Sequence, residues 1–237
     1  MLKEKDEIAI LMAAGLGTRM RPLTEQIPKP LVPVMGTPLI ETVICALERR
    51  GIKRIYVVVG YLKEQFSYLL EKYDNLEIVE NKEYLKKNNI SSLYAVRDIL
   101  GSSDCFICEA DLYVPDDTIF LRQYSTSCYF GKMIEGYSSD WVFDVQNGNI
   151  TRVGKGGTDT YNMAGISYWK RSDALIIKKA IEASYKKPGH EKLFWDEIVD
   201  QELKRLKVQV EEISPESVIE VDTLEELSQL DSRYKTC

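Results

Sequence analysis

The chain has few of the residues that nucleophilic and redox enzymes most often use. Its 237 residues include a single histidine, His190, which follows a Pro-Gly turn. A histidine in such a place is more often exposed or part of a cap than catalytic. The sequence offers no Ser-His-Asp or Cys-His constellation, so covalent catalysis by an activated serine or cysteine is not expected.

Cysteine is also sparse, and its spacing excludes a disulfide framework. The five cysteines are an odd number with no pattern typical of secreted scaffolds: Cys45, Cys105, Cys108, Cys128 and Cys237. Cys105 and Cys108 form a C-x-x-C, but the apolar residues around them indicate a strand, and no second pair follows. We therefore expect buried, unreactive thiols rather than a redox or zinc site.

Long apolar runs and excess positive charge are missing as well. No run approaches the roughly 18 apolar residues of a membrane span, and the charged N-terminal residues lead directly into a short apolar strand pattern at 8–14. We expect no membrane insertion and a cytoplasmic location. The net charge of −6 argues against a nucleic-acid partner, which would need a clustered basic face.

The first half of the chain alternates strand and helix patterns. Thr37, Pro38 and Gly51 predict the N-cap, first residue and end of one helix. Apolar and β-branched runs predict strands at 8–12, 54–59, 77–79 and 105–110, and periodicity predicts helices at 38–50, 63–73 and from 91 or 92 to about 100. Strands separated by helices indicate parallel βαβ units, with ligands bound at the carboxyl ends of the strands.

The second half reads as a smaller, antiparallel part. Short strands are predicted at 127–134, 141–145, 150–153 and 208–213, with a hairpin turn at 146–149 and helices at 173–186, 193–205 and 224–230. There is no linker and no internal repeat. We therefore expect one α/β domain over 1–237, with a mixed central sheet flanked by helices. Its nucleotide-binding half would span about 1–125 and its acceptor-binding half about 126–237.

The strongest motif is a glycine loop after the first strand. Residues 11–24 read L-M-A-A-G-L-G-T-R-M-R-P-L-T, and P-K-P-L follows at 28–31. Backbone N–H groups of such a loop can surround phosphates, and Arg19 and Lys29 supply cations. Met20 stands where a dinucleotide fingerprint needs its third glycine, and the Gly-Lys-Ser/Thr of a Walker A loop is missing. The alternative is an ordinary tight turn with surface cations.

Carboxylates stand at two places where a strand pattern ends. Asp111 closes the apolar run at 105–110, and Glu109 should lie on the same side of that strand. Glu220 and Asp222 form a second i, i+2 pair late in the chain. Mg²⁺ prefers oxygen ligands and usually takes one or two protein carboxylates together with phosphate oxygens. The alternative for each aspartate is capping of a helix.

The A-G-x-G-x-R loop followed by P-K-P resembles the signature of the sugar-phosphate nucleotidyltransferase superfamily. The resemblance implies a Rossmann-like nucleotidyltransferase fold in which Arg19 holds the β- and γ-phosphates and Lys29 neutralises the α-phosphate. The backbone that cradles base and phosphates would come from Ala13, Ala14, Gly15, Gly17 and Thr18. Mg²⁺ would be held by Asp111 and Asp222, with Glu220 as a further candidate.

Three other stretches resemble the phosphocholine cytidylyltransferases of this superfamily. They are N-N-I-S-S-L-Y-A at 88–95, F-W-D-E at 194–197 and E-V-D at 220–222. The resemblance implies Mg²⁺-dependent transfer of CMP from CTP to phosphocholine, giving CDP-choline and pyrophosphate. Asn89 and Ser92 would contact the nucleotide, and a choline kinase could supply the acceptor.

The composition of the second half agrees with a choline acceptor. A quaternary ammonium has no N–H to donate and is recognised by aromatic faces, often beside carboxylates. The candidate acceptor residues are Trp141, Tyr161, Trp195, Asp196 and Glu197. Core packing is the alternative for each aromatic ring. Two other functions remain open: a sugar-1-phosphate nucleotidyltransferase using UTP, dTTP or CTP, and a non-catalytic nucleotide-binding regulator.

Overall fold

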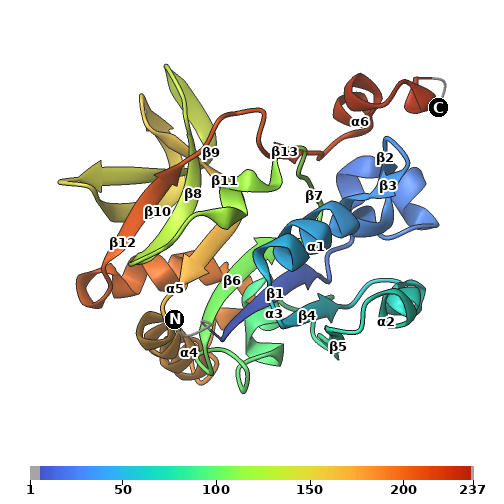
Figure 1. Cartoon of the computed structure of the whole chain (residues 1–237). Helices are drawn as coiled ribbons and strands as arrows, with labels where there is room; N and C mark the ends of the chain where they lie inside the picture. The colour runs from blue at the N-terminus through green and yellow to red at the C-terminus, as the bar shows by residue number, and fades with distance from the viewer. Residues whose placement is uncertain (1–5, 236–237) are drawn as a thin grey trace.

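The first half of the chain folds into parallel βαβ units, as its sequence pattern predicts. The computed structural model describes residues 6–235. Strands β1 (Glu7–Ala13), β4 (Arg54–Val59), β5 (Leu76–Glu80) and β6 (Asp104–Glu109) alternate with helices α1 (Leu39–Arg50), α2 (Tyr68–Lys72) and α3 (Ile90–Ala95). Strand β1 pairs in parallel with β4 and β6, and β4 pairs in parallel with β5 (Figure 1). The carboxyl ends of these strands therefore share one edge.

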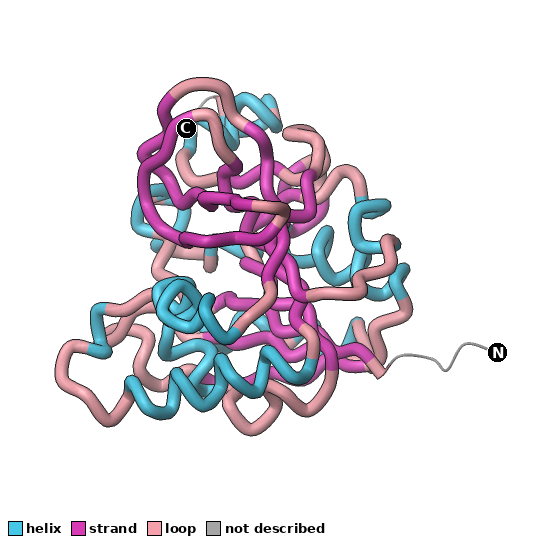
Figure 2. The backbone as a smooth tube through the Cα atoms, turned by 90° about the vertical axis from the view of Figure 1, so that its left-hand side faces the viewer, coloured by secondary structure: helices cyan, strands magenta, loops and turns pink. Residues whose placement is uncertain are grey.

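The second half adds five strands to the same sheet. They are β8 (Ser127–Met133), β9 (Tyr137–Gln146), β10 (Asn149–Thr158), β11 (Tyr161–Trp169) and β12 (Val208–Glu212). Of these, β9, β10 and β11 are longer than any strand in the first half. The main path of the nine-stranded sheet is β10-β9-β11-β6-β1-β4-β5, with β8 and β12 branching from β11. Figure 2 shows the strands next to one another through the middle of the molecule, with helices beside them. This mixed sheet flanked by helices confirms the α/β fold class.

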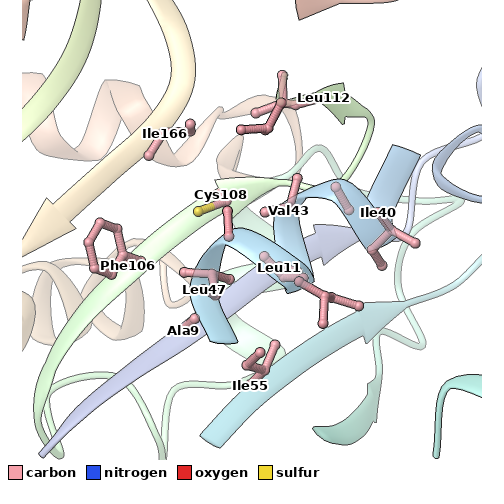
Figure 3. Close-up of a cluster of buried hydrophobic side chains, with 14 of the residues drawn as sticks. Ala9, Leu11, Ile40, Val43, Leu47, Ile55, Phe106, Cys108, Leu112 and Ile166 are labelled. Carbon is pink, nitrogen blue, oxygen red and sulfur yellow. The ribbon is translucent and has the colours of Figure 1, made fainter. Parts of the chain in front are cut away.

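Alternate residues of β1 supply cores on both faces of the sheet. Ala9 and Leu11 pack against α1, whereas Ile8 and Ile10 face α3, α4 (Arg171–Ser184) and α5 (Trp195–Glu202). Figure 3 shows Val43 and Leu47 of α1 over this part of the sheet. Each fully buried aliphatic side chain stabilises the fold by about 1.5–3 kcal/mol. Because both faces of the sheet are packed, the position of the edge at which the parallel strands end is fixed.

A third, smaller core ties the C-terminal segment to the glycine loop. Leu227 of helix α6 (Leu224–Leu230) and Val221 pack with Met20, Val32 and Val34. The last of these lies in β2 (Pro33–Val34), which pairs with β3 (Thr37–Pro38). Two further short strands, β7 (Leu112–Tyr113) and β13 (Ile219–Glu220), pair with each other. Residues more than 190 positions apart in the printed sequence, such as Met20 and Leu227, are thereby brought into one cluster.

Several predicted boundaries were wrong for local reasons. Thr37 is not a helix cap, because its backbone pairs with Val34, and α1 begins at Leu39 after Pro38. The helix predicted at 63–73 is a 3-10 turn (Lys63–Phe66) followed by α2, and those predicted at 91–100 and 193–205 are shorter α-helices, α3 and α5. Helix α4 begins at Arg171, earlier than predicted. Strand β11 was missed, whereas the positive φ angles of Asn147 and Gly148 confirm the hairpin turn.

The C-x-x-C lies inside the sheet. Cys105 and Cys108 are both buried on β6, and burial, with a smaller contribution from Asp104, raises the pKa of Cys105 to about 12. This confirms the expectation of buried thiols; Cys237 lies outside the described residues. Within residues 6–235, none of the helices has the length and apolar character needed to cross a bilayer.

Candidate active site

The glycine loop is held at the carboxyl end of β1 by close packing. Gly17 has a φ of +60°, and a Cβ there would lie 3.0 Å from the Lys29 Cβ and 3.1 Å from the Thr24 Cγ2. The Thr24 hydroxyl donates to the Gly17 carbonyl at 2.7 Å. Only glycine combines this left-handed backbone with so close an approach. The loop is therefore locked onto the turn that carries Lys29.

Lys29 is the centre of the site. Lys29 stands between Pro28 and Pro30 in the sequence, and its side chain is only 9% exposed. The ammonium Nζ lies 2.6 Å from the Asp111 Oδ2 and 2.7 Å from the Asp222 Oδ1. Burial alone would lower the pKa of Lys29, but the two carboxylates outweigh it and raise the pKa above the ordinary lysine value. Lys29 is therefore a buried, fully charged cation.

Arg19 adds a second, exposed cation to the lining of the site. Its Nη2 lies 2.8 Å from the Asp222 Oδ1, and its side chain is 67% exposed. An exposed ion pair of this kind contributes little to stability. The guanidinium is therefore free to leave Asp222 for a ligand phosphate without a large cost to the fold.

The C-terminal segment brings Asp222 to the other carboxylate. Strands β7 and β13 pair antiparallel, with Glu220 opposite Leu112, so the residues that follow β6 and β13 lie together. Thr223, not Asp222, is the N-cap of α6, because its Oγ1 accepts from the Glu226 N–H at 3.2 Å. The alternative that Asp222 serves only as a helix cap is therefore wrong.

Glu226 fixes the backbone of Asp222. Its Oε2 accepts from the N–H of Asp222 at 2.7 Å and from the N–H of Thr223 at 2.9 Å. The sequence carries the signal for this contact, since T-x-x-E is a capping box. We did not read it from the sequence.

We expect Glu226→Ala to lower the free energy of unfolding by about 1–2 kcal/mol, because two backbone donors lose a charged acceptor. Urea denaturation followed by circular dichroism measures this difference. Glu225→Ala is the matched control, since Glu225 is also exposed in the first turn of α6 and makes none of these bonds. Equal losses in both variants would show that the bonds of Glu226 contribute nothing.

The structure gathers the predicted nucleotide and metal residues around one cleft of about 310 Å³. Met12, Pro30 and Glu109 also line this cleft. The lining includes every residue predicted for these roles: Ala13, Ala14, Gly15, Gly17, Thr18, Arg19, Lys29, Asn89, Ser92, Asp111, Glu220 and Asp222. A volume of this size is at the lower end of the range for small-molecule sites.

The predicted acceptor residues are more dispersed. The Tyr161 hydroxyl donates to Glu212 at 2.9 Å, and Glu197 accepts from the Phe194 N–H at 2.8 Å, which caps α5. The half-buried Trp141 ring packs edge-on against Phe194, with a centroid separation of 5.3 Å. The predicted acceptor residues Tyr161, Glu197 and Trp141 are not in the lining of the main cleft.

Trp195 and Asp196 line a second, smaller cavity that shares wall residues with the main cleft. Trp195 is 3% exposed, stacks on Tyr129 and makes a T-shaped contact with Trp169, so very little of its ring is open. Asp196 is 4% exposed and accepts from the Tyr129 hydroxyl at 2.9 Å. Both line a cavity of about 10 Å³, whose wall also includes Met12 and Glu109 of the main cleft.

Two carboxyl groups in the wall of this second cavity, those of Glu109 and Asp196, have raised pKa values. Burial, together with the charges of Asp111 and Glu220, raises the pKa of Glu109 well above its usual value. Burial also raises the pKa of Asp196 to about 7, although the Tyr129 hydroxyl opposes the shift. A bound cation would relieve both carboxylates.

No group of three or more His, Cys, Asp or Glu side chains in residues 6–235 is arranged to hold a metal ion by itself. The site instead offers two aspartates that share one lysine. This donor set suits Mg²⁺, which commonly completes its shell with phosphate oxygens and water. A divalent ion here would need the phosphates of the ligand.

Cations for phosphates and carboxylates for a metal, set at the carboxyl edge of a Rossmann-like sheet, are typical of enzymes that transfer nucleotidyl groups. The chain belongs to the nucleotidyltransferase family: the family model described as Nucleotidyl transferase matches residues 8–136. This finding confirms the resemblance carried by the glycine loop.

Relatives narrow the family to its cytidylyltransferases. The chain is 52% identical over 227 residues to the 2-aminoethylphosphonate cytidylyltransferase of Lancefieldella rimae, covering 95% of this chain and 92% of that protein. It is 37% identical over 231 residues to the choline-phosphate cytidylyltransferase of Streptococcus pneumoniae, covering 96% and 98%. The solved structure of the CTP:phosphocholine cytidylyltransferase from Streptococcus pneumoniae matches with a TM-score of 0.88 at 35% identity, covering 96% of this chain and 99% of that one.

Proposed function

We propose that this protein transfers CMP from CTP to 2-aminoethylphosphonate and releases pyrophosphate. The observation that carries the proposal is the second cavity, which adjoins the nucleotide cleft and has the carboxylates of Glu109 and Asp196 in its wall. The 52% identity to a 2-aminoethylphosphonate cytidylyltransferase supports the same acceptor.

The size and polarity of the second cavity favour a primary ammonium. A volume of about 10 Å³ holds about one water molecule, and an –NH₃⁺ group is of similar size. Its three N–H donors suit carboxylate acceptors. A trimethylammonium group is several times larger and needs open aromatic faces, but the Trp195 ring is covered by its neighbours.

Phosphocholine, the acceptor that the sequence favours, is the second candidate. The 37% identity to a choline-phosphate cytidylyltransferase and the half-buried Trp141 ring support it. In that case Trp141 would present its face to the trimethylammonium group, with Trp195, Tyr161, Asp196 and Glu197 around it. This arrangement requires the rings to separate from their present neighbours.

The proposed reaction forms one P–O bond and breaks another. An oxygen of the acceptor phosphonate attacks the α-phosphorus of CTP, and the bond to the β-phosphate oxygen breaks with its electron pair leaving on pyrophosphate. The attacking oxygen is already anionic near neutral pH, so no general base is required. Lys29 neutralises charge that builds on the α-phosphate, and Arg19 holds the outer phosphates.

The remaining side chains position the two substrates. Asp111 and Asp222 would hold Mg²⁺, which when bound supplies positive charge to the phosphates. The loop at Ala14–Gly17 would surround the phosphates with backbone N–H groups, and Asn89 and Ser92 would lie against the nucleoside. Catalysis in this proposal is positioning combined with charge neutralisation.

Competition among acceptors tests the proposal. With purified enzyme, CTP and Mg²⁺, we expect kcat/KM for 2-aminoethylphosphonate to exceed that for phosphocholine by at least about tenfold, since the larger cation loses its place between the carboxylates. Pyrophosphate release measures each rate. Phosphoethanolamine, which has the same amine, should rank between them. Preference for phosphocholine would favour the second candidate, and preference for a hexose-1-phosphate would exclude both.

Asp196→Asn separates the role of the carboxylate from the shape of the cavity. The amide can still accept from Tyr129 but has lost the charge, so the KM for 2-aminoethylphosphonate should rise about 10- to 100-fold with that for CTP unchanged. Because the pKa of Asp196 is about 7, the wild-type KM for this acceptor should fall as the pH rises from 6 to 8. In Asp196→Asn this dependence should become smaller, and what remains comes from Glu109 and from the second ionisation of the phosphonate. Asp200→Asn, one turn along α5 and bonded to the Val153 N–H, is the matched control.

A further inference from the structure

Asn81 is a buried polar residue directly after β5, outside the lining of the main cleft. It is 2% exposed. Its Oδ1 accepts from the Glu83 N–H at 2.9 Å, which fixes the orientation of the amide, since a backbone N–H can only donate. Its Nδ2 must then face α3, where it donates to the Ser91 Oγ at 2.8 Å and the Ser92 Oγ at 3.2 Å.

The two serine hydroxyls differ in whether their proton has a hydrogen-bond acceptor. Ser91 donates its own proton to the Asn88 carbonyl at 2.8 Å, so its hydroxyl is used in both directions. Ser92 accepts from Asn81, and among the described residues no acceptor takes its proton. A buried hydroxyl proton without a partner is costly, so a ligand acceptor would be favoured there.

Ser92 lies at the place where we expect the base of the bound nucleotide. It lines both the main cleft and an adjoining hollow of about 150 Å³, and Ala14, Gly15 and Asn89 line both of them as well. Gly15 has open space where a side chain would begin, so a flat ring can approach the loop closely. The Ser92 hydroxyl is thus a polar group held at the junction between the phosphate loop and the hollow, and Asn81 and Ser91 line the hollow beside it.

We infer that Asn81 is a positioning residue that makes the nucleotide site select cytosine over uracil, by holding the Ser92 hydroxyl as a donor. Cytosine has an acceptor at N3 that can take the Ser92 proton, whereas uracil carries a hydrogen at N3 and would leave this buried proton unpaired there. The inference rests on the proposed function, in which CTP is the nucleotide. Rejection of a base that leaves a buried donor unpaired is commonly worth 10- to 100-fold or more.

Asn81→Asp tests the inference by reversing the polarity of the network. The carboxylate keeps the shape of the amide and can still accept from Glu83, but it can no longer donate. Ser92 would then turn its proton toward the carboxylate and offer lone pairs to the base. We expect the ratio of CDP to UDP affinity to fall at least tenfold, measured by calorimetry with Mg²⁺ at pH 8, where the carboxylate is ionised.

Two serine variants complete the experiment. Ser91→Ala is the matched control and should leave the ratio within about twofold, because the Ser91 proton already belongs to Asn88. Ser92→Ala should weaken CDP binding without improving UDP binding, and it decides the question if Asn81→Asp does not fold. An unchanged ratio in folded Asn81→Asp, or in Ser92→Ala, overturns the inference.

Measurements of nucleotide binding and of CMP transfer distinguish a failure of this inference from a failure of the proposed function. Calorimetry with CDP and UDP needs no acceptor. Wild-type protein that prefers CDP but transfers CMP to none of the acceptors would contradict the proposed function and leave the selection by Ser92 standing. Wild-type protein that transfers CMP and UMP equally well would overturn the role of Asn81 alone.

Discussion

Lys29→Ala should lower kcat by about 10²–10³ while changing the KM for CTP much less. Lys29 lies between Asp111 and Asp222, and its ammonium can interact with charge that develops on the α-phosphate during transfer. A contact that strengthens in the transition state affects turnover more than substrate binding. Steady-state pyrophosphate release with saturating acceptor measures both constants.

The fold of this variant needs a separate check. Removal of the ammonium leaves two carboxylates facing each other, so some loss of stability is expected, and circular dichroism would show whether the protein remains folded. Lys63→Ala is the control, because Lys63 pairs with Glu80 and is not among the residues that line the cleft. Unchanged turnover in folded Lys29→Ala would remove Lys29 from the mechanism. The raised pKa of Lys29 also means that its charge persists through mildly alkaline pH, so its contribution should not titrate between pH 6 and 9.

Local patterns were sufficient to predict which residues line the main cleft. The apolar run at 8–12 forms β1, and the glycines that follow it allow the sharp turn and close packing seen at Gly17. Asp111 lies two residues after the end of β6, and parallel strands bring their carboxyl ends to one edge. Strand and loop are both local in sequence, so the position of Asp111 beside the loop follows from topology alone.

The surroundings of the residues predicted to bind the acceptor were harder to predict because their contacts are long-range. Strand β11 mixes small, polar and aromatic residues, and only its pairing with β6, β8 and β9 makes it a strand. Trp195 looked available beside two acids, but its ring completes a core with Tyr129 and Trp169. Sequence spacing cannot distinguish an aromatic residue that binds a ligand from one that packs inside.

Asp222 shows both what the sequence indicates and what it leaves undecided. Its i, i+2 spacing from Glu220 predicted a common face, and both side chains do line the cleft. Its partner across 193 residues, Lys29, could not be inferred from spacing. The contact depends on the β7–β13 pairing and on the packing of α6 over the glycine loop.

Asp222→Asn should reduce Mg²⁺-dependent turnover at least about 100-fold with little change in stability. The amide keeps the shape of the side chain and can still accept from Lys29, but it loses the charge that a hard cation requires. Because Thr223 makes the helix cap and Glu226 holds the backbone, the substitution should not disturb α6. Turnover against Mg²⁺ concentration and thermal unfolding measure the two effects. Asp98→Asn, at an exposed site, is the control. Near-normal turnover with an unchanged Mg²⁺ requirement would exclude Asp222 as a metal ligand and leave Asp111 as the aspartate that holds the ion.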